Sequence, residues 1–199
     1  MLFFRRKAWL PALAGPACLV LACLSLAPAA QAMSLDDAVL AELNYARAHP
    51  AEYARELRRD PDADASGDRA ALEEAIDFLE RQSPLAPLEG DRRIAAAARE
   101  HSRAQAASGA VGHGAAGALG RRLQQNGVWA GLSAENISYG NDTATGVVRQ
   151  LIIDSGVPSR GHRRNIFSRG YQLAGVACGP HPTYDVVCVI DFAGALAAR

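Results

Sequence analysis

The chain has 199 residues, of which 21 are lysine or arginine and 21 are aspartate or glutamate, so its formal net charge is zero. Hydrophobic residues account for 49% of the sequence, which is enough for one domain with a packed core. No long block of basic residues is present, and the composition therefore excludes nucleic acid as an expected partner.

The first 32 residues have the pattern of a secretory signal peptide. Basic residues at positions 5–7 precede an apolar run that includes LACLSLAP, and the sequence AQA at 30–32 is a small-residue cleavage site. A retained membrane anchor is one alternative, and a lipoprotein attached through Cys23 is another. We expect an exported chain that starts at Met33, is secreted or periplasmic, and has no transmembrane segment after cleavage.

Residues 33–199 predict a single domain of the α+β class, with helices around a small antiparallel sheet. The apolar spacing predicts helices that begin at Ser34 and Pro50, and further helices over about 70–82, 91–108, 119–126 and 143–154. LSAENISYG, at 132–140, predicts a strand, and SRGHRRNIF, at 159–167, predicts a turn. Two segments rich in valine and isoleucine, 171–179 and 184–192, surround the turn-forming GPHP and predict a final β-hairpin. We expect the domain to be a monomer.

The predicted hairpin carries both cysteines that follow the signal segment, Cys178 and Cys188. Two thiols in an oxidising compartment pair by default, so we expect a disulfide between the two strands. Its role is predicted to be structural, because the chain has no CxxC motif of a redox protein.

Four side chains in the second half of the chain are candidates for chemistry. His113 lies in the glycine-rich VGHGAAG, Glu135 interrupts a strand-like run, and His162 lies in the turn SRGHRRNIF, where we expect Gly161 to let the backbone turn. Asp154 ends an apolar helix, where the helix dipole disfavours a carboxylate, so a cationic or metal partner is expected. Two histidines and two carboxylates indicate a divalent-metal or acid/base site.

The other two histidines of this half receive structural interpretations. His101 shares a helix face with Ile94 and Ala98 and is predicted to be a hydrogen-bonded packing residue. His181, in GPHPT, is predicted to be a solvated loop residue. The arginines of GHRRN are expected to cap neighbouring backbone or to pair with acids.

The motifs taken together resemble the CAP superfamily, also called SCP/TAPS, which includes cysteine-rich secretory proteins, antigen 5 and plant pathogenesis-related proteins. The resemblance rests on HG in a glycine-rich loop, AENISYG, a helix leading to GHRRNIF, and the final strand pair. LNYARAHP and PLEGDRRIAAAAREHSR resemble the family's first helices, and the likeness to the bacterial branch extends over about residues 35–192.

The resemblance implies a three-layer α-β-α sandwich whose central cleft carries two histidines and two acids. These would be His113, His162, Glu135 and Asp154. The chain departs from the family pattern in three ways: Ala134 replaces a glycine, Asp154 replaces a glutamate and so has a shorter reach, and Leu151 replaces a tryptophan. A segment at about 51–83 is interpreted as an insertion.

The insertion contains a possible calcium loop. Its ligands would be the oxygen-bearing side chains Asp62, Asp64, Ser66 and Glu73, with Gly67 at the sharp turn. The alternative is an acidic linker whose Asp68 caps the next helix.

Three functions remain open from the sequence. The resemblance implies an exported binding module whose cleft takes a divalent metal, such as Zn²⁺, and a small apolar or lipid-like ligand, without an organic cofactor. A metal-dependent hydrolase, with metal on His113 and His162 and Glu135 as the base, is the catalytic alternative. A purely structural role for the four side chains is the third.

Overall fold

The computed structural model describes residues 32–60 and 67–196. The chain divides into two units, Met1–Ala32 and Met33–Arg199, and the second unit contains all the described helices and strands. The predicted signal segment, up to residue 31, and three of the four predicted calcium ligands, Asp62, Asp64 and Ser66, lie outside the described residues.

Apart from the two-residue strand at 89–90, which the sequence does not predict, the helices and strands follow the expected order. They are α1 (Leu35–Ala48), α2 (Pro50–Arg59), α3 (Arg69–Arg81), β1 (Glu89–Gly90), α4 (Arg92–Ser108), α5 (Ala118–Gln125), β2 (Ser133–Tyr139), α6 (Ala144–Ile153), α7 (Gly161–Ile166), β3 (Leu173–His181) and β4 (Asp185–Ala193). One expectation is corrected: the sequence predicts a turn over 159–167, but most of these residues form the short helix α7. In the described ranges, every helix falls short of the length and apolar character that a membrane crossing needs.

The sheet has the strand order β1-β3-β4-β2. Strands β3 and β4 form the predicted antiparallel hairpin, and β2 joins the other side of β4 in the antiparallel sense. The two-residue strand β1 adds a parallel pairing to β3. The register sets Glu135 of β2 and Gly175 of β3 on either side of Asp191 in β4, which places an acidic pair inside the sheet.

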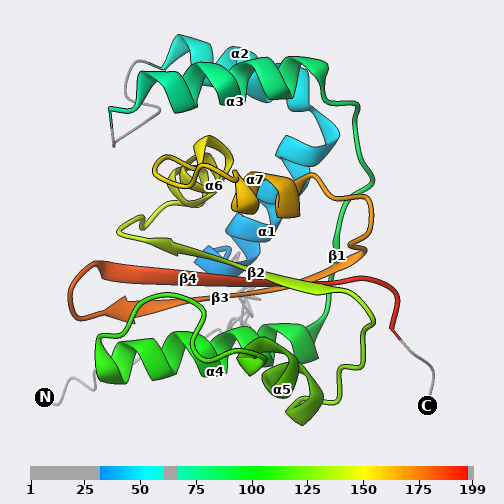
Figure 1. The fold of residues 1–199 in the computed structure, drawn as a ribbon, viewed down its shortest axis with the longest axis vertical. Coiled ribbons are helices and arrows are strands. Elements are labelled where there is room, and N and C mark those ends of the chain that lie inside the picture. Colours follow the sequence, from blue (N-terminus) through cyan, green and yellow to red (C-terminus); the bar gives the residue numbers. More distant parts are fainter. Residues whose placement is uncertain (1–31, 61–66, 197–199) are drawn as a thin grey trace, which may run out of the picture. The chain divides into compact units, whose positions relative to one another are not determined.

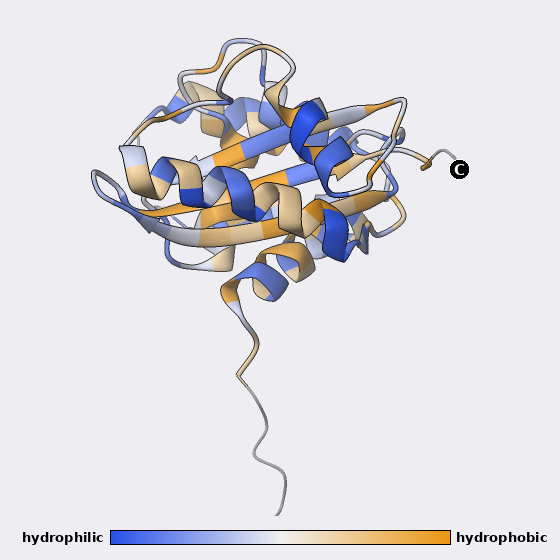
Figure 2. Cartoon of the chain, turned by 90° about the horizontal axis from the view of Figure 1, so that it is seen from below, coloured by the Kyte–Doolittle hydropathy of each residue, from blue (hydrophilic) through white to orange (hydrophobic). Residues whose placement is uncertain are grey.

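Helices cover both faces of the sheet, as Figure 1 shows, and the predicted three-layer α-β-α sandwich is confirmed. Helices α4 and α5 lie on one face, and α1, α6 and α7 lie on the other. In Figure 2 the strands show mainly hydrophobic colours, and the helices in front of them carry many hydrophilic residues. Helix α4 approaches β3 so closely that a Cβ atom added at Gly175 would lie 2.0 Å from the Ala95 backbone nitrogen, so only glycine fits there.

The segment interpreted as an insertion forms the helix pair α2 and α3, which lies outside the α1/α6/α7 layer in Figure 1. Its apolar side chains, among them Leu57, Ile76 and Leu79, are fully buried and belong to the main hydrophobic core. The pair therefore enlarges the core on this side instead of extending into solvent.

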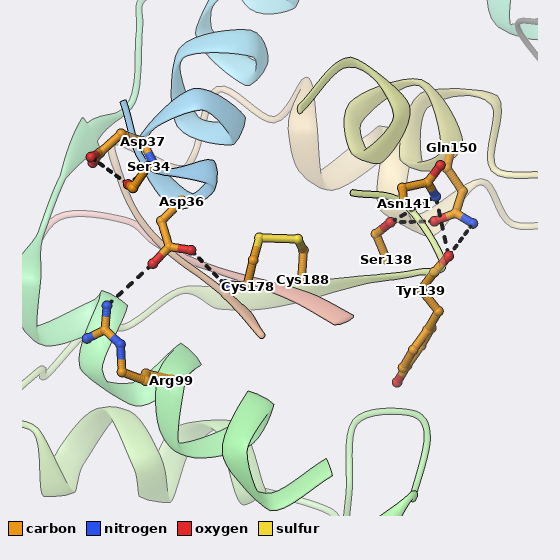
Figure 3. Close-up of a disulfide and its surroundings, with 10 residues drawn as sticks. All are labelled: Ser34, Asp36, Asp37, Arg99, Ser138, Tyr139, Asn141, Gln150, Cys178 and Cys188. Carbon is orange, nitrogen blue, oxygen red and sulfur yellow. Dashed lines mark hydrogen bonds and ion pairs between the residues drawn. A yellow bond between two sulfur atoms is a disulfide. The ribbon is translucent and has the colours of Figure 1, made fainter. Parts of the chain in front are cut away.

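The predicted disulfide between Cys178 and Cys188 is present and joins directly opposed residues of β3 and β4. Asp36, in the first turn of α1, accepts a hydrogen bond from the Cys178 backbone N–H at 2.7 Å, as Figure 3 shows. The same carboxylate lies 3.4 Å from the Arg99 guanidinium of α4. The hairpin is thus connected to a helix on each face of the sheet.

Candidate functional site

His162 occupies the second position of α7, immediately after a sharp change of backbone direction. The residue in the left-handed region is Arg160, with φ 49°, and not Gly161, whose φ is not positive; the expectation that Gly161 makes the turn is therefore wrong. Arg160 is held in this conformation because its guanidinium donates to the Asp154 and Val157 carbonyls and pairs with Glu74 of α3. These contacts offset the cost of a left-handed non-glycine residue.

The partner of His162 is Asp154, which ends α6 in a left-handed conformation with φ 57°. Its Oδ2 atom accepts from the His162 backbone N–H at 2.9 Å, and its Oδ1 atom lies 2.6 Å from Nδ1 of the same histidine. The Asp154 side chain is 2% exposed. The partner expected for this carboxylate from the sequence is therefore, in the first instance, an imidazole.

His113 and Glu135 form a second pair of the same kind. The loop that carries His113 has two left-handed glycines around it, Gly112 with φ 85° and Gly114 with φ 74°. His113 Nδ1 lies 2.9 Å from Glu135 Oε1, and Arg122 of α5 pairs with the other carboxylate oxygen. The His113 side chain is 57% exposed, whereas that of Glu135 is 2% exposed, so a fixed acid supports an accessible imidazole.

The two pairs face each other, because their imidazole centroids are 6.4 Å apart. Two asparagines of the recognised motifs hold them in this relation. Asn136, which follows Glu135 in β2, donates to the His162 carbonyl at 3.0 Å and accepts from the Asn165 side chain at 2.8 Å. The structure thus brings together all four side chains selected from the sequence, and we call them the His/acid site.

In each pair the Nδ1 atom of the histidine is engaged by a carboxylate. An ionised carboxylate only accepts hydrogen bonds, so Nδ1 is the donor in each pair, and in the neutral form of either ring the Nε2 atom has a free lone pair. The nitrogen atoms of the site that remain able to bind a ligand are therefore the Nε2 atoms of His113 and His162. This is the arrangement found where histidines bind metals and carboxylates orient them from behind.

Asp191, which the sequence does not single out as a site residue, is a fully buried acid beside Glu135 on the neighbouring strand. Burial and then the charge of Glu135 raise the pKa of Asp191 well above its ordinary value. Burial alone would raise the pKa of Glu135 too, but the hydrogen bond from His113 and the charge of Arg122 lower it. Their surroundings thus shift the pKa values of the two carboxylates in opposite directions. The available signal was a single acid in the otherwise apolar VVCVIDF.

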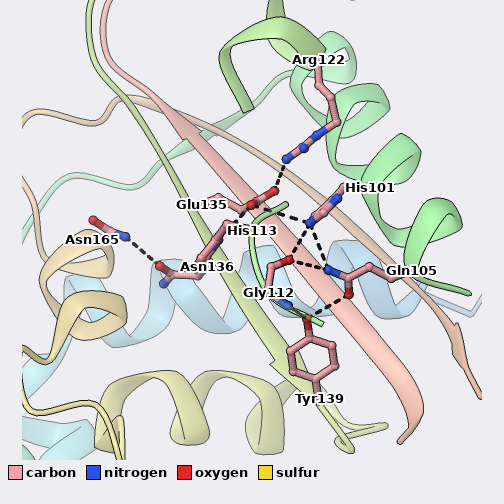
Figure 4. A network of polar contacts seen from close by, with 9 residues as sticks. All are labelled: His101, Gln105, Gly112, His113, Arg122, Glu135, Asn136, Tyr139 and Asn165. Atoms are coloured by element: carbon pink, nitrogen blue, oxygen red, sulfur yellow. Dashed lines mark hydrogen bonds and ion pairs between the residues drawn. The ribbon is translucent and has the colours of Figure 1, made fainter. Parts of the chain in front are cut away.

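A polar network fixes the loop that carries His113, as shown in Figure 4. The Gly112 N–H donates to the Tyr139 hydroxyl at 2.8 Å, which in turn donates to Gln105 Oε1 at 2.9 Å. The Gln105 amide nitrogen donates to the Gly112 carbonyl at 2.7 Å, and His101 Nε2 lies 2.9 Å from the same carbonyl. The expectation that His101 is a hydrogen-bonded packing residue is confirmed, and both backbone groups of Gly112 are engaged.

The prediction for His181 is wrong. Instead of being solvated it is 3% exposed, because the hairpin end folds against the loop at 109–112. Its Nε2 lies 3.2 Å from the Ala110 carbonyl, and its Nδ1 accepts from the backbone N–H groups of Thr183 and Tyr184. His181 is therefore a structural residue of the turn.

The described part of the predicted calcium loop shows helix capping. Asp68 accepts a hydrogen bond from the Ala71 N–H at 3.1 Å and caps α3, as the linker interpretation expects. The Glu73 carboxylate is half exposed and lies 3.8 Å from Arg69. Calcium binding stays a prediction, because three of the ligands lie outside the described residues.

Within the ranges 32–60 and 67–196, no three His, Cys, Asp or Glu side chains are grouped so that all could hold one metal ion. The His/acid site offers the two Nε2 atoms instead, with both acids already engaged on Nδ1. The residues present therefore fit a metal bound by two imidazoles and supported by two carboxylates, with further positions left for water or a ligand.

The chain is an α-β-α sandwich that carries two histidine–acid pairs close to β2, α6 and α7. These features define a class of domain, and comparison of the sequence with family models identifies that class. Residues 40–192 match the family described as CAP, the cysteine-rich secretory protein family, and the chain belongs to that family. The resemblance carried by AENISYG and GHRRNIF is confirmed. No curated protein matches the sequence.

Several solved bacterial structures resemble the chain. An extracellular protein containing an SCP domain from Bacillus anthracis is 22% identical with a TM-score of 0.46, over 68% of this chain and 44% of that one. An outer surface protein from Borrelia burgdorferi is 19% identical with a TM-score of 0.47, over 55% of this chain and 79% of that one. A cysteine-rich secretory protein from Staphylococcus aureus is 17% identical with a TM-score of 0.44, over 68% and 40%. The match thus spans less than half of the Bacillus and Staphylococcus proteins.

Proposed function

We propose that the protein is an exported binding module of the CAP family that holds a divalent metal ion, preferably Zn²⁺, between His113 and His162. The observation that carries this proposal is the pair of matched contacts, His113 Nδ1 to Glu135 at 2.9 Å and His162 Nδ1 to Asp154 at 2.6 Å. Both contacts leave Nε2 free on rings whose centroids are 6.4 Å apart. Zn²⁺ binds imidazole nitrogen at about 2.0–2.1 Å, and the proposal requires the two Nε2 atoms to reach one ion.

Each residue of the site has a distinct part in this proposal. The two histidines hold the ion, and Asp154 and Glu135 keep the Nδ1 protons in place, which makes each Nε2 a better donor. Arg122 compensates the charge of Glu135. A bound Zn²⁺ would supply a Lewis acid with open positions, at which a small ligand with an oxygen or nitrogen donor is held.

The binding role has more support than hydrolysis. A general base must be free to accept a proton, but one oxygen of Glu135 faces His113 and the other faces Arg122. Although burial alone would raise the pKa of Glu135, hydrogen bonding by His113 and the charge of Arg122 lower it, which weakens the carboxylate as a base. A lipid-like ligand at this site has less support too, since the side chains around the imidazoles are polar.

Export is part of the proposal and rests on two features. The N-terminal 32 residues have the pattern of a signal peptide. The chain has a disulfide between Cys178 and Cys188, and disulfides are typical of proteins in oxidising compartments.

Calorimetric titration of the metal-stripped protein with Zn²⁺ tests the metal site. We expect one binding site, which the His113→Ala/His162→Ala double variant loses. The exposed His49, on a different part of the molecule, provides the matched control, and His49→Ala should retain full binding. A folded protein that binds no Zn²⁺, or a double variant that binds it as well as the parent, would assign the four side chains a structural role.

A further inference from the structure

A buried arginine lies at a second location, at the end of α7 opposite to His162. Arg47 of α1 is 2% exposed. Its Nε and Nη2 atoms donate to the Ala86 carbonyl at 3.1 and 2.9 Å, and Nη1 donates to the carbonyls of Ile166 and Ser168. The guanidinium thus connects α1 to the segment before β1 and to the segment after α7.

The charge of Arg47 has no acidic partner. Among the described residues no carboxylate forms an ion pair with it, and burial lowers its pKa without an opposing contribution from an acid. Buried charges in proteins are as a rule paired, because carbonyl dipoles alone compensate a full charge incompletely. In addition, a guanidinium has five N–H donors, and the contacts within the described residues use four of them.

Arg47 lines a surface pocket with a volume of about 390 Å³. Arg169 lines it as well, is exposed, and forms no ion pair with any described acid. Tyr171 and Gln172 line the pocket too, and the Tyr171 hydroxyl has no hydrogen-bond partner among residues 32–60 and 67–196. The lining also includes the apolar side chains of Pro84, Leu85 and Pro87.

We propose that this pocket binds a small organic carboxylate with a short apolar chain. The carboxylate would bridge the free Nη2 donor of Arg47 and the guanidinium of Arg169, since a planar carboxylate matches the fork of a guanidinium. Its apolar chain would lie against Pro84 and Leu85. Phosphate is the competing anion, but it has no apolar part to lie against Pro84, Leu85 and Pro87.

The pocket is separate from the proposed metal site. Arg47 holds the carbonyl of Ile166, the last residue of α7, whereas His162 lies near the start of that helix. Neither His113 nor His162 lines the pocket. Failure of metal binding would therefore leave this proposal untouched, and the reverse also holds.

Nuclear magnetic resonance titration of the isotope-labelled protein with butyrate, at constant ionic strength, tests the proposal. We expect saturable shifts of the Ser168, Tyr171 and Gln172 amides. Butyramide, which has the same shape without the charge, should produce none. Arg169→Gln should weaken butyrate binding by about three- to fivefold, as expected for a partly exposed ion pair. Arg103→Gln removes one exposed charge from α4, on the opposite face of the sheet, and should leave binding unchanged.

Three outcomes would overturn the assignment. These are shifts that do not saturate, equal weakening by Arg169→Gln and Arg103→Gln, and phosphate binding at least as tight as that of butyrate. The His113→Ala/His162→Ala variant should bind butyrate like the parent, which confirms that the two sites are independent. Arg47→Lys keeps the charge but loses the fork, and it should weaken butyrate binding further than Arg169→Gln if the protein remains folded.

Discussion

At the scale of single residues, Asp154 shows how one side chain can meet two demands. It occupies a left-handed backbone position at the end of α6, which aspartate and asparagine tolerate better than most residues. From there its two oxygens reach the backbone and the ring of His162. The shorter side chain, compared with the glutamate expected from the family, is sufficient because the contact is with the histidine and not with a more distant ion.

Asp154→Asn tests this orienting role. Asparagine keeps the backbone conformation and the size, but a neutral amide no longer stabilises the Nδ1–H tautomer of His162 as a carboxylate does. We expect Zn²⁺ affinity to fall by about 10- to 100-fold, the usual effect of losing a partner behind a metal-binding histidine. Calorimetry measures the change, and Asp142→Asn, at an exposed position, is the control. Unchanged affinity would show that Asp154 only shapes the turn.

Asp191 makes a prediction about pH. Its pKa is raised in the folded protein by burial and by the charge of Glu135, so the folded state retains a proton that the unfolded chain loses above about pH 4. The contribution of this group to stability is thus present at lower pH and is lost as pH rises toward the folded pKa. Asp191→Asn removes the titration. We expect the free energy of unfolding of the variant, relative to the parent, to increase from pH 4 to pH 7.

Urea unfolding of the metal-free protein at several pH values measures this difference. Asp142→Asn, at an exposed position, is the control variant. A constant difference for Asp191→Asn would mean that Asp191 is ionised in the folded protein.

At the scale of elements, the loop before His113 depends on contacts with β2 and α4. Tyr139 ends β2, and its hydroxyl connects the Gly112 N–H to Gln105 of α4. Tyr139 is therefore a positioning residue, because it acts on the proposed metal site only through the backbone next to His113.

Tyr139→Phe removes only the hydroxyl. We expect stability to fall by about 1–2 kcal/mol, because the Gly112 N–H loses its acceptor, and we expect weaker Zn²⁺ binding with faster hydrogen exchange at Gly112. Tyr184→Phe is the matched control, since Tyr184 is 44% exposed and packs near Tyr139 without belonging to the network. If Tyr139→Phe loses stability but binds Zn²⁺ normally, the network supports the fold and not the site.

At the scale of the whole molecule, the sequence predicts those features that depend on local patterns. Apolar spacing and capping residues located the helices other than α7 to within a few residues. The two motifs located Glu135 and His162, the glycine-rich loop located His113, and the end of an apolar helix located Asp154. The features that it missed depend on contacts between distant segments. Asp191 looks like an isolated strand acid until the register places it beside Glu135. His181 looks exposed until its turn meets the loop at 109–112. Arg160, and not Gly161, adopts the left-handed conformation because its guanidinium contacts Glu74, which is 86 residues away in the sequence.

The disulfide acts at this same scale. It joins residues separated by 10 positions, and closing so short a loop is expected to stabilise the fold by roughly 2–3 kcal/mol. The Cys178 N–H bond to Asp36 also connects the hairpin to α1, and Asp36 connects it to Arg99 on the other face of the sheet. The double variant Cys178→Ala/Cys188→Ala should lose that amount of stability in urea unfolding, and reduction of the parent protein should reproduce the loss while leaving the variant unchanged. A clearly larger loss in the variant would mean that the contacts to Asp36 and Arg99 fail with the disulfide, so that the hairpin holds both helical layers together.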